Sequence, residues 1–208
     1  MLAADLGLPV PEPFLLEIDP ALAVVVTEPR LQAVLHRSVR PTFASRKLPP
    51  GFMSWPINRP IPVDLRQTAV EIFAFDALIQ NPDRRISNAN LLFDGRNVAI
   101  FDHELAFATG MLFGWRPPWK LGALQSMLNA ADGDRHVFLD GLRGHEPDLT
   151  RLIQAWTALT DFRVQEYRTA LPPQWGDSGR AVDDALNLIV GVRDNIMLCV
   201  DEITRILA

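Results

Sequence analysis

The sequence predicts an α+β protein, in which a small strand-containing part precedes a larger helical part. Three observations support this fold class. Asp94-Gly95 stands between two short apolar runs, which is typical of a β-hairpin. Residues 64–80 are apolar on nearly every side, as in a buried helix. After Asp102 the apolar residues recur mostly at helical spacing.

The first part is predicted to cover residues 1–63. It begins within what resembles the last turns of a helix that stops at Gly7. Independent domains rarely begin in this way, so we expect this part to be the remnant of a larger N-terminal lobe with its hinge. Residues 14–18 are predicted to form a strand, which Asp19-Pro20 closes.

Residues 40–63 are predicted to form a long loop. They contain six prolines, a density that excludes a regular helix. Aromatic side chains are expected to pack this proline-rich loop against the protein: Phe43, Phe52 and Trp55.

The second part is predicted to cover residues 64–208. Asp64 is expected to be the N-cap of its first helix, and Gln67 could complete a capping box. Asn81-Pro82 should end this helix, because a residue before proline avoids the helical conformation. A polar loop then leads into the hairpin, whose second strand ends just before Asp102.

Helices are expected over most of the remaining chain: 121–131, 135–142, 147–170 and 180–207. The last of them repeats apolar residues at alternating three- and four-residue spacing. We expect this stripe to pack against the other helices, with a dimer interface as the alternative.

The composition excludes several classes of protein. A hydrophobic share of 48% and a charged share of 22% indicate a globular protein rather than a disordered one. The net charge of −5 disfavours nonspecific binding to nucleic acid. No apolar run has the length of a membrane span, and the N-terminus lacks the pattern of a signal peptide. We therefore expect a cytoplasmic protein with neither nucleic acid nor membrane as a partner.

Cysteine and tryptophan are expected to serve packing. The single cysteine, Cys199, cannot form an internal disulfide, which fits a reducing compartment, and its apolar neighbours favour a core position. Four tryptophans could mark a binding surface, but packing is the expected role of these large side chains: Trp115, Trp119, Trp156 and Trp175.

Three polar residues around the hairpin have the order that phosphoryl transfer requires. Asp83 is followed by Asn88 five positions later, and Asp102 comes directly after the hairpin. An Asp can orient the attacking hydroxyl, while an Asn and a second Asp hold Mg²⁺ against the phosphates of ATP. Either Arg84 or Arg85 could pair with a phosphate or with an acidic residue of the loop.

Other interpretations of these residues stay open at this point. Asp and Asn are common in turns, where their side chains bond to nearby backbone, so Asp102 could simply cap Leu105. Asp102 and Glu104 could form the acid/base pair of a glycosidase. His103-Glu104 lacks the second histidine of a zinc protease, because position 107 is phenylalanine.

Two stretches of the chain resemble the catalytic core of HipA-like kinases. They are residues 75–92 and residues 100–107, and the first contains Asn81-Pro82-Asp83-Arg84-Arg85-Ile86-Ser87-Asn88. Residues 6–13 and 43–49 also look like the compact bacterial members of that group. The resemblance implies a two-lobed, protein-kinase-like fold with ATP held between the lobes. It also implies that Asp83 is the catalytic base, with Arg84 beside it in the catalytic loop, and that Asn88 and Asp102 bind Mg²⁺ and ATP.

The chain departs from that family pattern near its start. In such kinases a glycine-rich loop and a lysine-bearing strand hold the phosphates, whereas here no G-x-G-x-x-G occurs and the lysines are Lys47 and Lys120. Two hypotheses follow. The protein is an ATP- and Mg²⁺-dependent phosphotransferase that acts on a protein Ser/Thr or another hydroxyl, or it is a non-catalytic, kinase-like binding or regulatory module.

Overall fold

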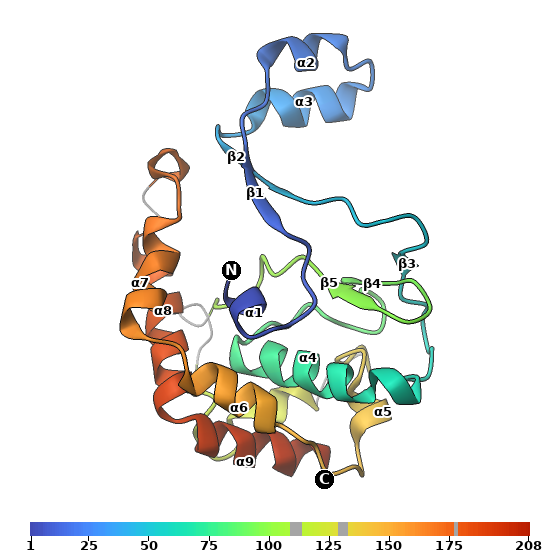
Figure 1. Ribbon diagram of the computed structural model, residues 1–208, viewed down its shortest axis with the longest axis vertical. Coiled ribbons are helices and arrows are strands. Elements are labelled where there is room, and N and C mark those ends of the chain that lie inside the picture. Colours follow the sequence, from blue (N-terminus) through green and yellow to red (C-terminus); the bar gives the residue numbers. More distant parts are fainter. Residues whose placement is uncertain (109–113, 129–132, 177–178) are drawn as a thin grey trace.

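The computed structural model describes residues 1–108, 114–128, 133–176 and 179–208, and within these ranges the protein is α+β. An arm made of β1, α2, α3 and β2 rises from a helical body (Figure 1). In the body, helix α4 lies beneath the β4–β5 hairpin, α6 and α9 lie below α4, and α7 and α8 run side by side along one flank (Figure 1).

The arm is a two-stranded antiparallel sheet that carries two short helices between its strands. Phe14 pairs with Ala44 in the sheet. Both helices begin with a proline that follows an acidic N-cap residue. The side chains of these caps, Asp19 and Glu28, accept hydrogen bonds from backbone N–H groups of the first turn. The bounds are β1 Pro13–Leu16, α2 Pro20–Val25, α3 Pro29–Arg37 and β2 Thr42–Ser45.

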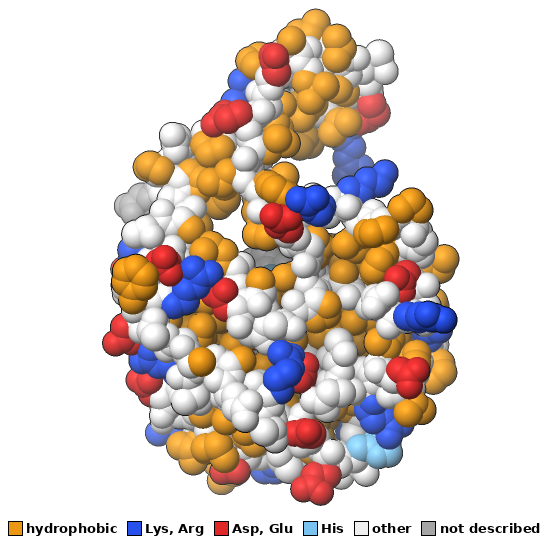
Figure 2. Space-filling model, in the orientation of Figure 1, with side chains coloured by type: hydrophobic (Ala, Val, Ile, Leu, Met, Phe, Trp, Pro, Cys, Tyr) orange, Lys and Arg blue, Asp and Glu red, His pale blue; other side chains and the backbone are white. Residues whose placement is uncertain are grey.

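The surface of the arm is largely apolar. All four residues of β1 are exposed, and α3 has no buried residue. Figure 2 shows apolar side chains gathered over this part of the molecule. The prediction of a long loop over residues 40–63 is therefore wrong in two respects. The segment contains β2 and the short strand β3 (Met53–Ser54), and Phe43 is 63% exposed because it lies on the exposed face of β2.

The second sheet, in the order β3-β4-β5, confirms the predicted hairpin. Strand β4 (Leu91–Phe93) pairs antiparallel with β5 (Val98–Ile100), and Phe93 lies opposite Val98. The side chain of Asp94 accepts hydrogen bonds from the N–H groups of Arg96 and Asn97 in the connecting turn. Trp55 packs edge-on against Phe93, so this aromatic residue of the proline-rich loop does anchor it.

The N-terminal helix α1 (Leu2–Asp5) ends at a glycine, as predicted. Gly7 has a φ of +71°, its N–H donates to the carbonyl of Ala4, and the N–H of Leu8 donates to that of Ala3. These two bonds form a Schellman motif, which requires a left-handed residue at Gly7. The guanidinium of Arg151 donates to the carbonyl of Leu6 and ties this turn to the helical body.

Helix α4 (Arg66–Leu78) is buried along almost its whole length, as predicted, but it starts differently. Asp64 lies inside a 3₁₀ turn, η1 (Val63–Leu65), and does not cap the helix. The chain enters this turn at Pro62, whose carbonyl accepts from the N–H of Leu65. Gln67 does not complete a capping box, because its amide donates to Glu71 and to the carbonyl of Asp148.

The rest of the body consists of short helices, and several predicted helices are divided or shortened. The bounds are η3 Ala123–Met127, α5 Leu139–Leu142, α6 Thr150–Thr157, α7 Asp161–Thr169, η4 Pro173–Trp175, α8 Gly179–Asp194 and α9 Ile196–Leu207. The helix predicted over 147–170 breaks because Thr160 caps α7 through its hydroxyl. The helix predicted over 180–207 breaks at Asn195, and part of the one predicted over 121–131 lies outside the described residues.

One apolar core joins α1, α4, the hairpin and the helical body. Most of the apolar stripe of the last predicted helix lies in this core, as expected: Leu186, Ile189, Ile196, Ile203 and Leu207 are buried. Val182 and Val200, the other members of the stripe, are half-buried and pack against it. Burial raises the pKa of Cys199 to about 12, so the group is an unreactive thiol at neutral pH. Trp156 is also fully buried.

None of the helices in the described ranges combines the length and the apolar character that a membrane span needs.

Candidate functional site

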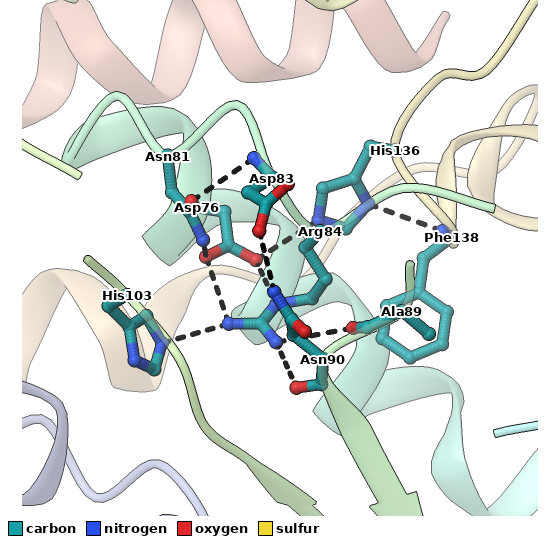
Figure 3. Close-up of polar contacts among 9 residues, drawn as sticks. All are labelled: Asp76, Asn81, Asp83, Arg84, Ala89, Asn90, His103, His136 and Phe138. Atoms are coloured by element: carbon teal, nitrogen blue, oxygen red, sulfur yellow. Dashed lines mark hydrogen bonds and ion pairs between the residues drawn. The ribbon is translucent and has the colours of Figure 1, made fainter. Parts of the chain in front are cut away.

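The loop between α4 and β4 holds Asp83 in a fixed position (Figure 3). The backbone N–H of Asp83 donates to Oδ1 of Asn81 over 3.2 Å. Its carboxylate oxygen Oδ2 accepts from the side-chain amides of Asn88 (3.0 Å) and Asn90 (2.9 Å). These bonds use one oxygen of the half-buried carboxylate, and within the described residues no hydrogen bond involves the other oxygen, Oδ1.

The same loop is fixed from outside by residues 134–137. The hydroxyl and the backbone N–H of Ser87 both donate to the carboxylate of Asp134, and the N–H of Ile86 donates to the carbonyl of Arg135. The N–H of Val137 donates back to the carbonyl of Arg84. These bonds also explain why the helix predicted over 135–142 is shortened to α5. Arg135 and Val137, which were expected in its first turn, instead form backbone hydrogen bonds with the loop.

Arg84 is buried at the centre of the site and uses every donor on protein atoms (Figure 3). Nε donates to Oδ2 of Asp76 over 2.6 Å, and Nη2 donates to Oδ1 of the same carboxylate over 3.3 Å. Nη1 donates to the carbonyls of Ala89 and Asn90, and Nη2 also reaches Nε2 of His103 over 2.8 Å. The prediction that Arg84 pairs with a phosphate or with an acidic residue of the loop is therefore wrong, because its buried side chain pairs with Asp76 of helix α4.

Asp76 carries its charge without contact with water. Burial by itself would raise the pKa of this carboxyl, but the charge of Arg84 and the hydrogen bond from His136 outweigh that effect and hold the pKa well below its ordinary value. Asp76 and Arg84 therefore form a buried ion pair, which joins the loop between α4 and β4 to helix α4.

His136 completes this cluster as a neutral ring. Its Nδ1 accepts from the backbone N–H of Phe138 over 3.2 Å, so the ring proton is on Nε2, which donates to Asp76 over 3.1 Å. Burial lowers the pKa of His136, in agreement with this geometry.

Asp102 and Asn88, the two predicted Mg²⁺ ligands, are both exposed at the surface of the site. The amide nitrogen of Asn88 is used by Asp83, which leaves its Oδ1 as a possible metal ligand. Asp102 follows β5 and offers a carboxylate, so the two residues present the hard oxygen donors that Mg²⁺ prefers. The described residues contain no group of three or more His, Cys, Asp or Glu that could hold a metal ion. The predicted Mg²⁺ site does not require such a group, because its protein ligands are one Asn and one Asp.

The comparison with protein families identifies the chain. The family model described as "HipA-like kinase" matches residues 1–112, more than half of the chain. The protein belongs to the HipA-like kinase family. The matched range includes Asp83, Asn88 and Asp102. Searches of curated proteins and of solved structures returned no match.

The sequence indicates four residues of this region of the HipA-like kinase, namely Asp83, Arg84, Asn88 and Asp102, but not the other buried polar residues around Arg84. The structure brings Asp83 and Asn88 into direct contact, whereas Asp76, Asn90 and His136 had been given no role in this site. One signal could have revealed Asp76, which is the one charged residue in the apolar second half of α4, because a buried carboxylate requires a cationic partner. Nothing in the sequence showed that the partner would be Arg84.

The stability of the protein is expected to decrease as the pH falls below about 6.5, the ordinary pKa of histidine. In the unfolded chain His136 regains that pKa, whereas burial lowers it in the folded protein. The unfolded state therefore binds more protons between the two values, and the free energy of unfolding is lost as the pH falls through this window. Above this pH window His136 is neutral in both the folded and the unfolded protein, so it no longer makes the stability depend on pH.

Urea denaturation at about pH 5 and about pH 7.5 measures this effect. In His136→Gln the loss of stability between the two pH values should be smaller than in the wild type. The remaining loss includes the share of His103, whose pKa burial and the charge of Arg84 lower to about 4. An equal loss in both proteins would contradict the account of His136.

Proposed function

We propose that this HipA-like kinase is an ATP- and Mg²⁺-dependent phosphotransferase that modifies a hydroxyl group, such as that of a Ser or Thr in a protein. The observation that carries the proposal is the geometry of Asp83. One carboxylate oxygen is held by two asparagine amides, and the other is left to accept a proton.

In the proposed reaction Asp83 orients the acceptor hydroxyl and receives its proton. The hydroxyl oxygen forms a bond to the γ-phosphorus of ATP, and the bond from that phosphorus to the bridging oxygen of ADP breaks. Because this chemistry depends on positioning and on neutralising charge, a rigid loop matters more than additional reactive groups. The bonds from the backbone N–H of Arg85 to the carbonyls of Asp83 and Asn88 supply part of that rigidity.

Asn88 and Asp102 are the residues that would hold Mg²⁺. The metal, when bound, would neutralise the negative charge on the phosphates of ATP. The contact between Arg84 and His103 supports this assignment, since each of these residues directly follows a proposed site residue, Asp83 and Asp102 respectively. The contact therefore draws the two segments of the site together.

A second candidate function is a non-catalytic, kinase-like module. It is favoured by the small number of lysines, Lys47 and Lys120, and by the lack of a G-x-G-x-x-G sequence within these residues. Lys47 is exposed and lies between β2 and β3, outside any strand. Such a module would use the same site for recognition, without transfer.

Incubation with γ-³²P-labelled ATP and protein acceptors that contain Ser and Thr distinguishes the two functions. A phosphotransferase should label itself or an acceptor when MgCl₂ is present, and the label should disappear when EDTA removes the metal. A folded protein that binds Mg²⁺-ATP without transferring label would favour the non-catalytic module.

A further inference from the structure

Asp102 has a backbone conformation that its surroundings must maintain. Its φ is +55°, in the left-handed region that few non-glycine residues adopt. Aspartate tolerates this conformation better than most residues, but such a residue persists only where neighbouring contacts fix the chain on both sides. The direction of the Asp102 carboxylate therefore depends on what holds residues 101 and 103.

The residue before Asp102 is held by the hairpin. The N–H of Phe101 donates to the carbonyl of Asn90 over 3.2 Å. The same carbonyl accepts from Nη1 of Arg84, so Arg84 already contacts the strand beside Phe101.

The residue after Asp102 is held by Arg84 through a side chain. Nε2 of His103 lies 2.8 Å from Nη2 of Arg84. A guanidinium can only donate, so Nε2 accepts and the ring proton is on Nδ1. The His103 and Phe75 rings also pack in a T-shaped arrangement, with 5.8 Å between their centroids, and the backbone carbonyl of His103 accepts from the N–H of Ala106. Figure 3 shows the ring and the guanidinium facing each other.

We propose that His103 is a positioning residue, which accepts the hydrogen bond of Arg84 and thereby holds Asp102 in the conformation that directs its carboxylate to Mg²⁺. That Asp102 binds Mg²⁺ is part of the proposed function, and this half of the inference depends on it. The positioning itself rests on the Arg84–His103 contact and on the left-handed backbone of Asp102.

The arrangement couples the two halves of the site. Arg84 is fixed by the buried carboxylate of Asp76 and by two backbone carbonyls, so it is a rigid donor. Arg84 directly follows Asp83 in the chain, and it contacts His103, which directly follows Asp102. One buried arginine therefore sets the relative placement of the proposed base and the proposed metal ligand.

Two variants at position 103 separate positioning from simple packing. In His103→Gln the amide oxygen can replace Nε2 as the acceptor of the Arg84 bond, whereas in His103→Leu the apolar contact with Phe75 stays and the acceptor is lost. The wild type and both variants are compared by hydrogen exchange of peptides that cover residues 100–107, with peptides from α9 as the internal control. Binding of Mn²⁺ in the presence of ATP is measured on the same samples.

We expect faster exchange at residues 100–107 in His103→Leu, with α9 unchanged, and a Mn²⁺ affinity lowered about 10- to 100-fold, as for other residues that orient metal ligands. His103→Gln should stay close to the wild type in both measurements. The inference is overturned if His103→Leu exchanges and binds like the wild type, or if both variants lose order and affinity equally. A wild type that binds no Mn²⁺-ATP would refute the proposed function, and hydrogen exchange alone would then decide whether His103 positions Asp102.

Discussion

Asp83→Asn is expected to lower the rate of phosphoryl transfer about 10²- to 10⁴-fold, the range typical for loss of a general base. Asparagine has the shape of aspartate, and its amide oxygen can still accept the hydrogen bonds of Asn88 and Asn90. The loop should therefore keep its structure. What disappears is the free carboxylate oxygen that would accept the proton of the acceptor hydroxyl.

Asp94→Asn is the matched control for this experiment. Asp94 is an exposed turn residue of the hairpin and also accepts hydrogen bonds, but they come from the turn residues Arg96 and Asn97 and not from residues of the site. Label transfer from ATP, measured for both variants with the same acceptor, should be lost in Asp83→Asn and preserved in Asp94→Asn. If Asp83→Asn retained the wild-type rate, Asp83 could not be the base.

Arg84→Met is expected to destabilise the protein by about 3–5 kcal/mol, the usual cost of breaking a buried ion pair by removing one partner. Methionine fills similar volume but leaves the charge of Asp76 buried without its main counter-charge. It also leaves the carbonyls of Ala89 and Asn90 without their donor. Chemical denaturation gives the difference in the free energy of unfolding.

Two further variants test whether the buried charge is the reason. Arg168→Met removes an arginine that pairs with Asp183 at the surface, where solvent screens the charges, so its effect should be much smaller. In the double variant Asp76→Asn/Arg84→Met no charge of the pair remains, and the amide oxygen introduced at position 76 can still accept from His136. This protein should be more stable than Arg84→Met alone, and the account fails if Arg84→Met costs no more than Arg168→Met.

Features that depend on neighbouring residues could be predicted from the sequence. The hairpin follows from the Asp94-Gly95 turn, the end of α1 follows from Gly7, and the burial of α4 follows from its apolar sequence. The pairing of Asp83 with Asn88 lies within one loop, so local spacing was sufficient to place these two residues together.

Features that depend on distant parts of the chain could not be predicted. His136 is 60 residues from its partner Asp76, and no periodic pattern relates them. The break before α7 depends on the hydrogen bond that the Thr160 side chain accepts from the backbone, and the spacing of apolar residues does not indicate whether this bond forms. The start of α4 differs because Pro62 is the N-cap of a 3₁₀ turn, two residues before the expected cap Asp64. In each case a tertiary or capping contact decided between local conformations that the sequence alone left possible.

The most direct test of the central claim is a calorimetric titration of Mg²⁺-ATP into the 208-residue protein, with Asp102→Asn as the comparison. We predict saturable binding by the wild type and an affinity at least about tenfold lower in Asp102→Asn, because an amide is a weaker Mg²⁺ ligand than a carboxylate. A well-folded wild type that binds no Mg²⁺-ATP, or an Asp102→Asn variant that binds it equally well, would contradict the assignment of this site to ATP- and Mg²⁺-dependent phosphoryl transfer.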